Sequence, residues 1–419
     1  MKPPITQRVI LLAILFLTLL VAYLDRVNVS ILVTDGQFLD AMGIKGQPVR
    51  IGLLMTLFLI AYGVSNVLFS PLGDWMGPRK AMSLSIFLWG AALVFGGLSS
   101  TFTIMLASRV ALGIGEGMHW PMQSKYVKHW FPPGQRGKAN SLWLVGLMVG
   151  PAVAMPFFTW IIPIIGWRYS FFLLALFGCA PLVLIWFFTT DHPGQNRRIS
   201  RAEHDAIETG LTAEQEREIA AAGQGIGSNV KAFACNYRFW LLTVFYTCFG
   251  SVWWGTMTWL PSYLKQARGF SWAAMGWWAS LPYCLGIINV ILFGWLSDKA
   301  KRRAPFAALA MLGAAAGIFF GAHAPDNRTA AILISLGVAS IAIGLPSVWT
   351  LLQHIVPGRA VGAGAGMMNG VANGLSALAP VAIGFFINAS GGYMGGLMFL
   401  VSLTLLGFAC MAVLAFQRY

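Results

Sequence analysis

Long hydrophobic segments recur along the whole chain and are separated by short polar stretches. A helix that spans a bilayer needs about 20 mostly apolar residues. Irregular backbone exposed to lipid is excluded, so these segments predict an all-α membrane protein. We expect twelve transmembrane helices in two groups of six: residues 8–34, 50–72, 81–99, 102–127, 138–162 and 167–189, then 237–264, 271–296, 303–323, 327–355, 360–388 and 392–416.

A polar stretch between the two groups predicts the domain organisation. Residues 191–236 are rich in Glu and Arg and indicate an amphipathic surface helix within a tether. We therefore expect an N-terminal six-helix bundle over residues 1–190, a cytoplasmic linker over 191–236 and a C-terminal six-helix bundle over 237–419. The first apolar run is longer than a signal peptide and lacks a clear cleavage site, so we expect it to remain as the first helix.

Composition supports a membrane protein. The 419 residues are 57% hydrophobic and 10% charged, against about 25% charged in globular proteins, and the mean hydropathy is +0.70. The net charge of +14 would suggest nucleic acid in a soluble protein. Most of the 28 Lys and Arg residues, however, fall in loops on one side of the predicted membrane, which places both termini in the cytoplasm. We expect no nucleic-acid partner.

Other chemistry is not indicated by the sequence. The five Cys residues show no disulfide or metal-ligand spacing, so we expect packing roles for them, no metal and no cofactor. No Ser/His/Asp arrangement or phosphate-binding Gly loop suggests an enzyme. A membrane sensor would normally need an output domain longer than the linker, so this alternative is also disfavoured.

Four ionisable residues lie well inside predicted spans: Asp25 and Arg26 in the first, Arg109 and Glu116 in the fourth. Such groups are costly at membrane depth and usually functional. Arg109 and Glu116 are seven residues apart, on one helical face and about 10 Å apart along the axis. Asp25 and Arg26 are adjacent, so their side chains diverge by about 100° and each needs an outside partner. These four residues are the predicted working centre.

The residue types in this centre suit the transport of an anion with protons. An Arg fork captures a carboxylate with two hydrogen bonds, and a partly desolvated carboxylic acid takes up a proton near neutral pH. Asp25 and Glu116 are therefore candidate proton carriers, and Arg26 is a candidate substrate ligand. Static ion pairs, Asp25 with Arg109 or Glu116 with Arg26, are the alternative. Glycines at positions 113, 115 and 117 would let another helix approach Glu116 closely, whether for function or only for packing.

Two loops carry a repeated pattern. Residues 73–80 and 294–303 each place an Asp at a helix end before a short turn and several cations. The pattern resembles the signature of the major facilitator superfamily, in which two six-helix halves rock around a central cavity. The resemblance implies gating roles for Asp74, Arg79 and Asp298. A pair of ordinary basic turns is the alternative interpretation.

The charged motifs of the first and fourth spans resemble the anion:cation symporter branch of this superfamily, which includes bacterial sugar-acid/proton symporters and vesicular glutamate and sialic acid carriers. The resemblance implies proton-coupled import of a small organic anion across a bacterial cytoplasmic membrane by a monomer. It places Asp25 and Glu116 on the proton-coupling acids and Arg26 and Arg109 on the buried arginines. It also implies substrate contacts for four further residues: Tyr23, Tyr62, Trp349 and Asn369. His119, one helical turn after Glu116, is a possible tuner of the proton or a structural histidine.

Departures from that branch bear on the substrate. Leu147, Pro346 and Val348 stand where sugar-acid carriers have hydrogen-bonding residues, which suits a less hydroxylated acid. Tryptophans in the seventh and eighth spans could form an apolar wall for such an acid, or could serve packing and the membrane interface: Trp253, Trp254, Trp259, Trp277 and Trp278. Anion exchange, or uptake driven by membrane potential without protons, is the alternative function.

Overall fold

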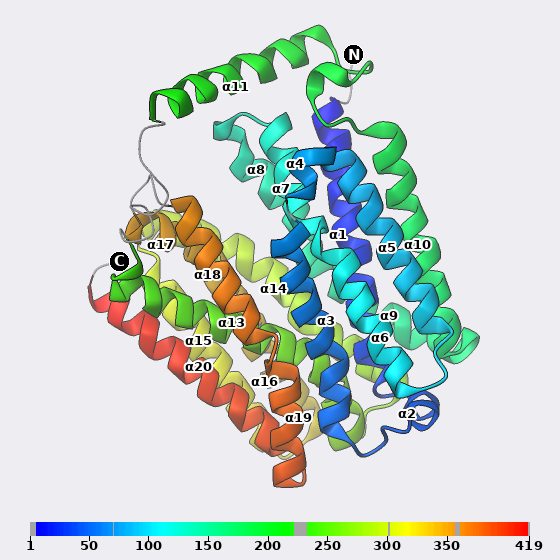
Figure 1. The fold of residues 1–419 in the computed structure, drawn as a ribbon. Coiled ribbons are helices and arrows are strands. Elements are labelled where there is room, and N and C mark those ends of the chain that lie inside the picture. The colour runs from blue at the N-terminus through cyan, green and yellow to red at the C-terminus, as the bar shows by residue number, and fades with distance from the viewer. Residues whose placement is uncertain (1–5, 70, 222–232, 301, 357–360, 418–419) are drawn as a thin grey trace, which may run out of the picture. The chain divides into compact units, whose positions relative to one another are not determined.

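The structure is a computed structural model that describes residues 6–69, 71–221, 233–300, 302–356 and 361–417; at 74, 213–221, 298 and 361–363 it describes only the backbone. Over these residues it contains helices and no strand (Figure 1). The helices of the first half are α1 (Gln7–Leu32), α2 (Gly36–Met42), α3 (Pro48–Phe69), α4 (Leu72–Met76), α5 (Pro78–Gly97), α6 (Phe102–Gly117), α7 (His119–Trp130), α8 (Pro133–Leu144), α9 (Gly146–Ile165) and α10 (Trp167–Phe188).

The chain then continues through the linker into the second half. The linker contains the short 3-10 helix η1 (Pro193–Gln195) and α11 (Arg201–Ala221). The remaining helices are α13 (Tyr237–Ser262), η2 (Tyr263–Ala267), α14 (Trp272–Ala300), α15 (Ala304–His323), α16 (Asn327–Ser340), η3 (Ile341–Gly344), α17 (Leu345–Ile355), α18 (Val361–Ser376), α19 (Ala379–Ser390) and α20 (Tyr393–Phe416).

Within the described residues, ten helical stretches are long and apolar enough to cross a membrane. They match ten of the predicted spans, and three of them join consecutive helices: α8 with α9, α16 with α17, and α18 with α19. The two other predicted spans are also helical. Residues 102–127 form α6 and α7, and residues 237–264 lie almost entirely in α13, whose many Trp, Tyr, Thr and Gly residues make it less hydrophobic. The predicted all-α class is confirmed.

Prolines explain two features of these helices. Pro121 has no N–H for the carbonyl of Gly117, four residues earlier, and the helix is interrupted at Met118, between α6 and α7. Pro163 likewise cannot bond to the carbonyl of Thr159 within α9. The indole Nε1 of Trp272 donates to this Thr159 oxygen instead, at 2.6 Å.

The chain divides into two compact units that do not follow the order of the sequence. Unit 1 consists of Met1–Asp25, Ile60–Gly150 and Ile165–Gln224, and unit 2 consists of Arg26–Leu59, Pro151–Ile164 and Gly225–Tyr419. The predicted division at 190 and 236 remains a prediction. The boundary between units in α1 falls between Asp25 and Arg26, two of the four predicted charged residues.

Unit 1 is held together by close packing around α5, which contacts α6, α7 and α10. A Cβ on Gly115 would lie 2.6 Å from the backbone nitrogen of Trp89, so α6 and α5 touch backbone to backbone. At one end of α1, the Glu203 carboxylate accepts hydrogen bonds from the backbone N–H groups of Gln7 and Arg8 and forms an ion pair with the Arg8 side chain. The linker helix is thereby fixed to the first helix.

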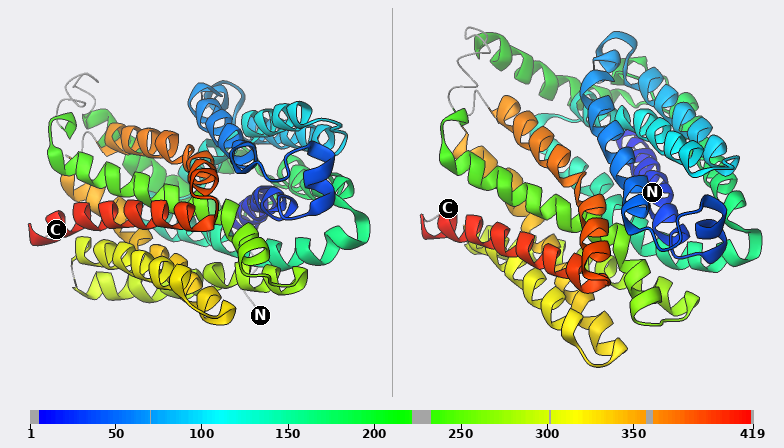
Figure 2. Two further views of the ribbon diagram at one scale, coloured as in Figure 1. Left: turned by 90° about the horizontal axis from the view of Figure 1, so that it is seen from below. Right: turned by 60° about the horizontal axis from the view of Figure 1, so that its bottom comes forward.

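Unit 2 joins segments from both halves of the sequence. α15 packs along α16 and α20, and α13 packs against α18, α19 and α20 (Figures 1 and 2). The first part of α3 meets α19 at two glycines: a Cβ on Gly52 would lie 2.5 Å from the Pro380 carbonyl oxygen, and one on Gly384 would lie 2.5 Å from that of Pro48. Thr56 Oγ1 also accepts from Val381 N at 3.2 Å. These helices are therefore in direct backbone contact.

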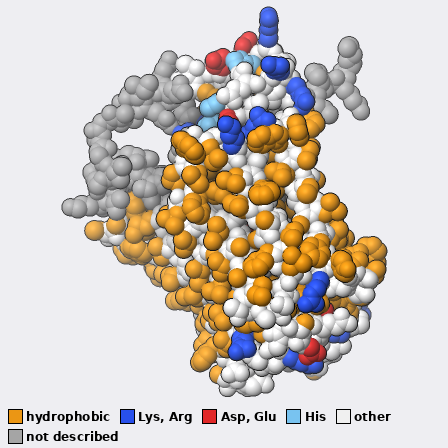
Figure 3. All heavy atoms as spheres, turned by 45° about the vertical axis from the view of Figure 1, so that its right-hand side comes forward, with side chains coloured by type: hydrophobic (Ala, Val, Ile, Leu, Met, Phe, Trp, Pro, Cys, Tyr) orange, Lys and Arg blue, Asp and Glu red, His pale blue; other side chains and the backbone are white. Residues whose placement is uncertain are grey.

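The surface matches a membrane environment. Figure 3 shows a broad band of hydrophobic side chains on one face, with Lys and Arg gathered above and below it. Much of α10 is exposed, including large apolar side chains such as Leu176 (65%) and Phe187 (64%). Exposed apolar area of this extent is unfavourable in water and is expected where lipid is the solvent.

Candidate functional site

Three of the four predicted charged residues come together in unit 1. Asp25, Arg109 and Glu116 are all buried, at 1%, 2% and 0% exposure. The Arg109 guanidinium interacts electrostatically with both carboxylates and lies 5.1 Å from the ring centroid of Phe171. Its Nε and Nη2 atoms make no hydrogen bond to any described residue. Arg109 thus links the two acids and keeps two donor nitrogens, Nε and Nη2, for water or an anion.

Helix α6 is shaped around Glu116. The hydroxyls of Ser65 and Ser85 donate to the carbonyls of Ile114 and Gly115 at 2.7 and 2.5 Å. A Cβ on Gly117 would lie 2.5 Å from the Ser65 Cβ. The expectation that the glycines let another helix approach closely is confirmed for Gly115, at α5, and for Gly117, at α3.

His119 begins α7, directly after the interruption at Met118. It is 2% exposed, and its ring packs edge-on against Trp89 with centroids 5.7 Å apart. Gln123, fully buried, places its Nε2 3.1 Å from His119 Nε2 and 2.9 Å from the Leu15 carbonyl oxygen. The histidine therefore belongs to a network that connects α7 to α1.

Arg26 lies in unit 2 and is 5% exposed. Its guanidinium carbon is 5.4 Å from the ring centroid of Phe58 on α3 and 5.6 Å from that of Trp254 on α13. Aromatic faces attract cations, more strongly where water is excluded. Two aromatic rings from different helices therefore hold Arg26 inside the protein.

The other predicted substrate contacts occupy varied surroundings. Tyr23 is buried, and Tyr62 is half-buried, both in unit 1. Trp349 on α17 is 40% exposed and packs edge-on against Tyr246, with centroids 5.9 Å apart. Asn369 on α18 accepts a hydrogen bond from Asn373 Nδ2 at 2.8 Å. The substrate roles of these four residues remain predictions.

The predicted tryptophans of α13 and α14 have different surroundings. Trp254 faces Arg26, whereas Trp259 is buried and donates from Nε1 to the Pro380 carbonyl at 2.9 Å. Trp253 packs on Tyr283, and Trp277 is 68% exposed. Of the predicted aromatic set, Trp254 is the residue in contact with a site cation.

Of the predicted gating residues, Arg79 has described side-chain contacts; Asp74 in α4 and Asp298 in α14 have side chains outside the described part. The backbone N–H of Arg79 donates to Asp191 Oδ1 at 2.7 Å, and its Nη2 donates to the Trp186 carbonyl. The Asp191 carbonyl contacts His129 Nδ1 at 2.9 Å, and His129 stacks on His192. Burial lowers the pKa of the His129 imidazole, which favours its neutral form in this corner.

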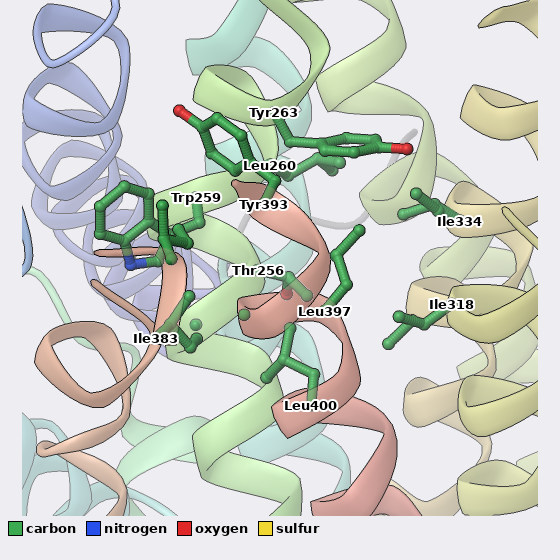
Figure 4. A pocket seen from close by; sticks show the side chains of 13 residues that line it. Thr256, Trp259, Leu260, Tyr263, Ile318, Ile334, Ile383, Tyr393, Leu397 and Leu400 are labelled. Atoms are coloured by element: carbon green, nitrogen blue, oxygen red, sulfur yellow. The ribbon is translucent and has the colours of Figure 1, made fainter. Parts of the chain in front are cut away.

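Other concave or ligand-like groups differ from this site. A pocket in unit 2, between α13, α15, α16, α19 and α20, is lined mainly by apolar side chains such as Ile318, Ile334 and Leu400 (Figure 4). No Asp, Glu, Lys, Arg or His lines it, so it does not suit an anion. Among the described residues, His204, Asp205 and Glu208 on α11 have metal-ligand spacing. Both acids of that group are exposed and contact His204, so the group is a cluster of surface side chains in contact with one another.

Several contributing residues were not predicted. Ser65, Ser85 and Gln123 carry no signal beyond being polar residues within predicted spans, and their role depends on which carbonyls they meet. Asp191 did carry a signal, because it is the first acid after the sixth predicted span. Phe58 and Trp254 could not be distinguished from other apolar residues, because contact with Arg26 depends on how the helices pack.

Breaking the buried charge cluster should destabilise unit 1 in a non-additive way. Arg109→Gln leaves Asp25 and Glu116 without their shared cation, and removing one partner of a buried pair costs about 3 kcal/mol. We expect Arg109→Gln/Glu116→Gln to lose less stability than the sum of the single variants. Unfolding in detergent micelles measures all three; additive losses would contradict the cluster.

Comparisons with known proteins agree with this structure. The family model of the major facilitator superfamily matches residues 15–380. A probable sulfoacetate transporter of Cupriavidus necator is 31% identical over 99% of this chain and 95% of that protein. A D-galactonate transporter of Escherichia coli is 25% identical over 96% of this chain and 94% of that protein.

A solved structure shares the fold. The inward-facing, unoccupied structure of a bacterial homologue of the human lysosomal transporter Spinster matches with a TM-score of 0.77, at 18% identity, over 100% of this chain and 99% of that chain. The relatives are named as transporters, and none of the three is named as an enzyme. With its apolar helices, this chain is an integral, multi-pass membrane protein of the major facilitator fold. The chain belongs to the major facilitator superfamily.

Proposed function

We propose that this protein is a proton-coupled symporter that imports a small organic anion across the bacterial cytoplasmic membrane by alternating access. The observation that carries the proposal is the buried Arg26 guanidinium between Phe58 and Trp254. A guanidinium presents a planar pair of donors that matches a carboxylate or sulfonate, and the two rings hold that group in place. Arg109 offers two further donors in unit 1.

Two observations favour an acid with few hydroxyl groups. Arg26 has apolar ring neighbours in unit 2. By the resemblance, Leu147, Pro346 and Val348 stand where sugar-acid carriers have hydrogen-bonding residues. One relative is named for sulfoacetate and another for D-galactonate, which are anions without and with a polyol chain, respectively. We propose a short carboxylate or sulfonate as the substrate, contacted also by Tyr23, Tyr62, Trp349 and Asn369.

Replacing the Arg26 fork should weaken substrate binding. Arg26→Lys keeps the charge but loses the planar pair of donors, and we expect the dissociation constant to rise at least about tenfold, or 1.4 kcal/mol. Binding of sulfoacetate, aldonates, uronates and aromatic carboxylates to purified protein measures it. Arg50→Lys, the same change at an exposed arginine, is the control. Equal effects of the two variants would remove Arg26 from the substrate site.

Asp25 and Glu116 are the proposed proton carriers. Each lies buried beside Arg109, so binding a proton removes one negative charge from a cluster that water does not screen. Protonation and anion binding can then alternate as the two neutralising events of a transport cycle. His119 is the proposed tuner of this step.

Glu116→Gln should separate coupling from movement. We expect loss of uphill accumulation driven by a proton gradient in proteoliposomes, with exchange of internal for external substrate retained, because the amide cannot carry a proton. Glu208→Gln, at an exposed linker acid, should accumulate substrate normally. Uphill accumulation by Glu116→Gln would instead favour anion exchange or uptake driven by membrane potential.

The contacts of unit 2 support a closed outer gate. By the predicted orientation, the pieces of the first half that belong to unit 2, within residues 26–59 and 151–164, are outer ends of spans 1, 2 and 5. The Gly52–Pro380 and Pro48–Gly384 contacts join span 2 to α19, and the Trp272–Thr159 hydrogen bond joins span 5 to α14. We propose that these contacts separate when the protein opens outward.

A side chain at Gly52 should prevent this gate from closing. Gly52→Val places atoms against the Pro380 carbonyl, so we expect the outward-open state to be favoured. Uptake should fall about tenfold or more, as a shift of 1.4 kcal/mol requires, while binding from outside persists. Gly63→Val, on the same helix with nothing within 4 Å of its Cβ, is the control. Normal uptake by Gly52→Val would contradict the gate.

A further inference from the structure

Two asparagines one helical turn apart on α18, Asn369 and Asn373, form a hydrogen-bonded pair. Asn373 Nδ2 lies 2.9 Å from the backbone carbonyl oxygen of Asn369 and 2.8 Å from Asn369 Oδ1. A carbonyl oxygen only accepts, so the group of Asn373 that faces it must be the amide nitrogen. That nitrogen only donates, so the atom of Asn369 that it meets must be the amide oxygen. These contacts fix the orientation of both amides, which is otherwise ambiguous between oxygen and nitrogen.

The pair uses one end of the Asn369 amide and leaves the other end available. Oδ1 accepts from Asn373, whereas Nδ2 makes no hydrogen bond to any described residue. Asn369 is half-buried, and its Nδ2 is not enclosed, so water or a ligand can reach this nitrogen. Asn373 directs its own N–H groups at Asn369. The donors that remain for a ligand are therefore the two N–H groups of Asn369.

The face of α18 beside the pair is open and does not suit lipid. α18 belongs to a stretch long and apolar enough to cross a membrane, Gly364–Ser390. A helix face turned toward lipid carries large apolar side chains, as α10 does with Leu176 and Phe187, and polar side chains are costly there. Next to the asparagines, α18 instead exposes three glycines, on each of which a Cβ would meet no described atom within 4 Å: Gly366, Gly370 and Gly374. This face therefore suits a wet passage.

The chemistry of the available N–H groups matches an anion. An ionised carboxylate or sulfonate accepts hydrogen bonds and cannot donate them. The opposite orientation of the Asn369 amide would present Oδ1, a second acceptor, to the same anion. An amide also has no net charge, so Asn369 is not left as an unpaired charge when the anion departs. Asn369 can therefore add a directional contact while Arg26 supplies the charge.

We propose that Asn373 is a positioning residue that holds the Asn369 amide with its N–H groups toward the substrate, which selects an anionic oxygen at this point. This inference rests on the proposed contact between Asn369 and the substrate. Asn373 acts through Asn369 and needs no substrate contact of its own. The same orientation rejects a group that can only donate, such as an ammonium. The site thus accepts the anionic end of an acid.

The test measures binding of sulfoacetate to purified protein, or of the tightest of the aldonates, uronates and aromatic carboxylates. The carboxylate of Asn373→Asp only accepts, so Asn369 must turn its nitrogen toward position 373 and its oxygen toward the anion. We expect the dissociation constant to rise about tenfold or more. Asn373→Leu removes the contact without imposing the opposite orientation, so its dissociation constant should lie between those of the wild type and Asn373→Asp. Asn388→Asp, the same change at an exposed asparagine on α19, should bind as the wild type does.

A double-mutant cycle separates positioning from the added charge. A new carboxylate repels an anion whether or not the Asn369 amide is present, whereas turning requires that amide. Asn373→Asp should therefore raise the dissociation constant by a smaller factor in the Asn369→Leu background than in the wild type. Equal factors in the two backgrounds would overturn the inference.

Nitrogen-15 NMR of labelled asparagine gives a readout without substrate. The Asn369 side-chain signal is assigned by its loss in Asn369→Leu. Its amide hydrogens should exchange quickly with water in the wild type and more slowly in Asn373→Asp, where Nδ2 becomes hydrogen-bonded. Slow exchange of the Asn369 amide already in the wild type would contradict the proposed orientation.

The Arg26→Lys variant distinguishes this inference from the proposed function. Weaker binding by Arg26→Lys together with unchanged binding by Asn369→Leu and Asn373→Asp would overturn the role of the asparagine pair and leave anion transport standing. Absence of binding of every one of these acids to the wild type would overturn both.

Discussion

The structure depends on the cost of keeping ionised groups away from water. A charge placed in hydrocarbon loses its hydration, and only charges, dipoles or aromatic faces of the protein can replace that hydration. In unit 1, Arg109 interacts electrostatically with Asp25 and Glu116 and so offsets part of their lost hydration. In unit 2, the rings of Phe58 and Trp254 do the same for Arg26. The two interactions differ in kind. Opposite charges attract one another directly, whereas aromatic rings stabilise a cation through their faces.

The same constraint explains the local shape of α6 and α7. Because Pro121 leaves the Gly117 carbonyl without its helical donor, the helix is interrupted one residue before His119. Serine hydroxyls from α3 and α5 reach the carbonyls just before Glu116. Glycines permit that approach because nothing projects from the helix there. The carbonyls of Ile114 and Gly115, just before Glu116, are thus satisfied by neighbouring helices in place of solvent.

Sequence reasoning predicted the parts of this arrangement that depend on composition and short spacing. The helical class, most span boundaries and the four charged residues follow from hydropathy, because lipid imposes one rule on every residue it touches. Three contacts join residues far apart in sequence: Trp254 with Arg26, Asp191 with Arg79, and Gln123 with Leu15. Helix periodicity cannot predict these contacts, because each depends on the rotation and depth of a second helix.

Pro163 in α9 has a consequence for how water enters the protein. It leaves the Thr159 oxygen to the indole of Trp272, so this oxygen has no replacement donor in its own helix when the indole withdraws. A buried carbonyl without a hydrogen bond costs on the order of 1–3 kcal/mol. Separation of α9 from α14 therefore becomes more favourable if a water molecule enters between the two helices and donates to the Thr159 oxygen. Hydration of this oxygen is then coupled to the separation.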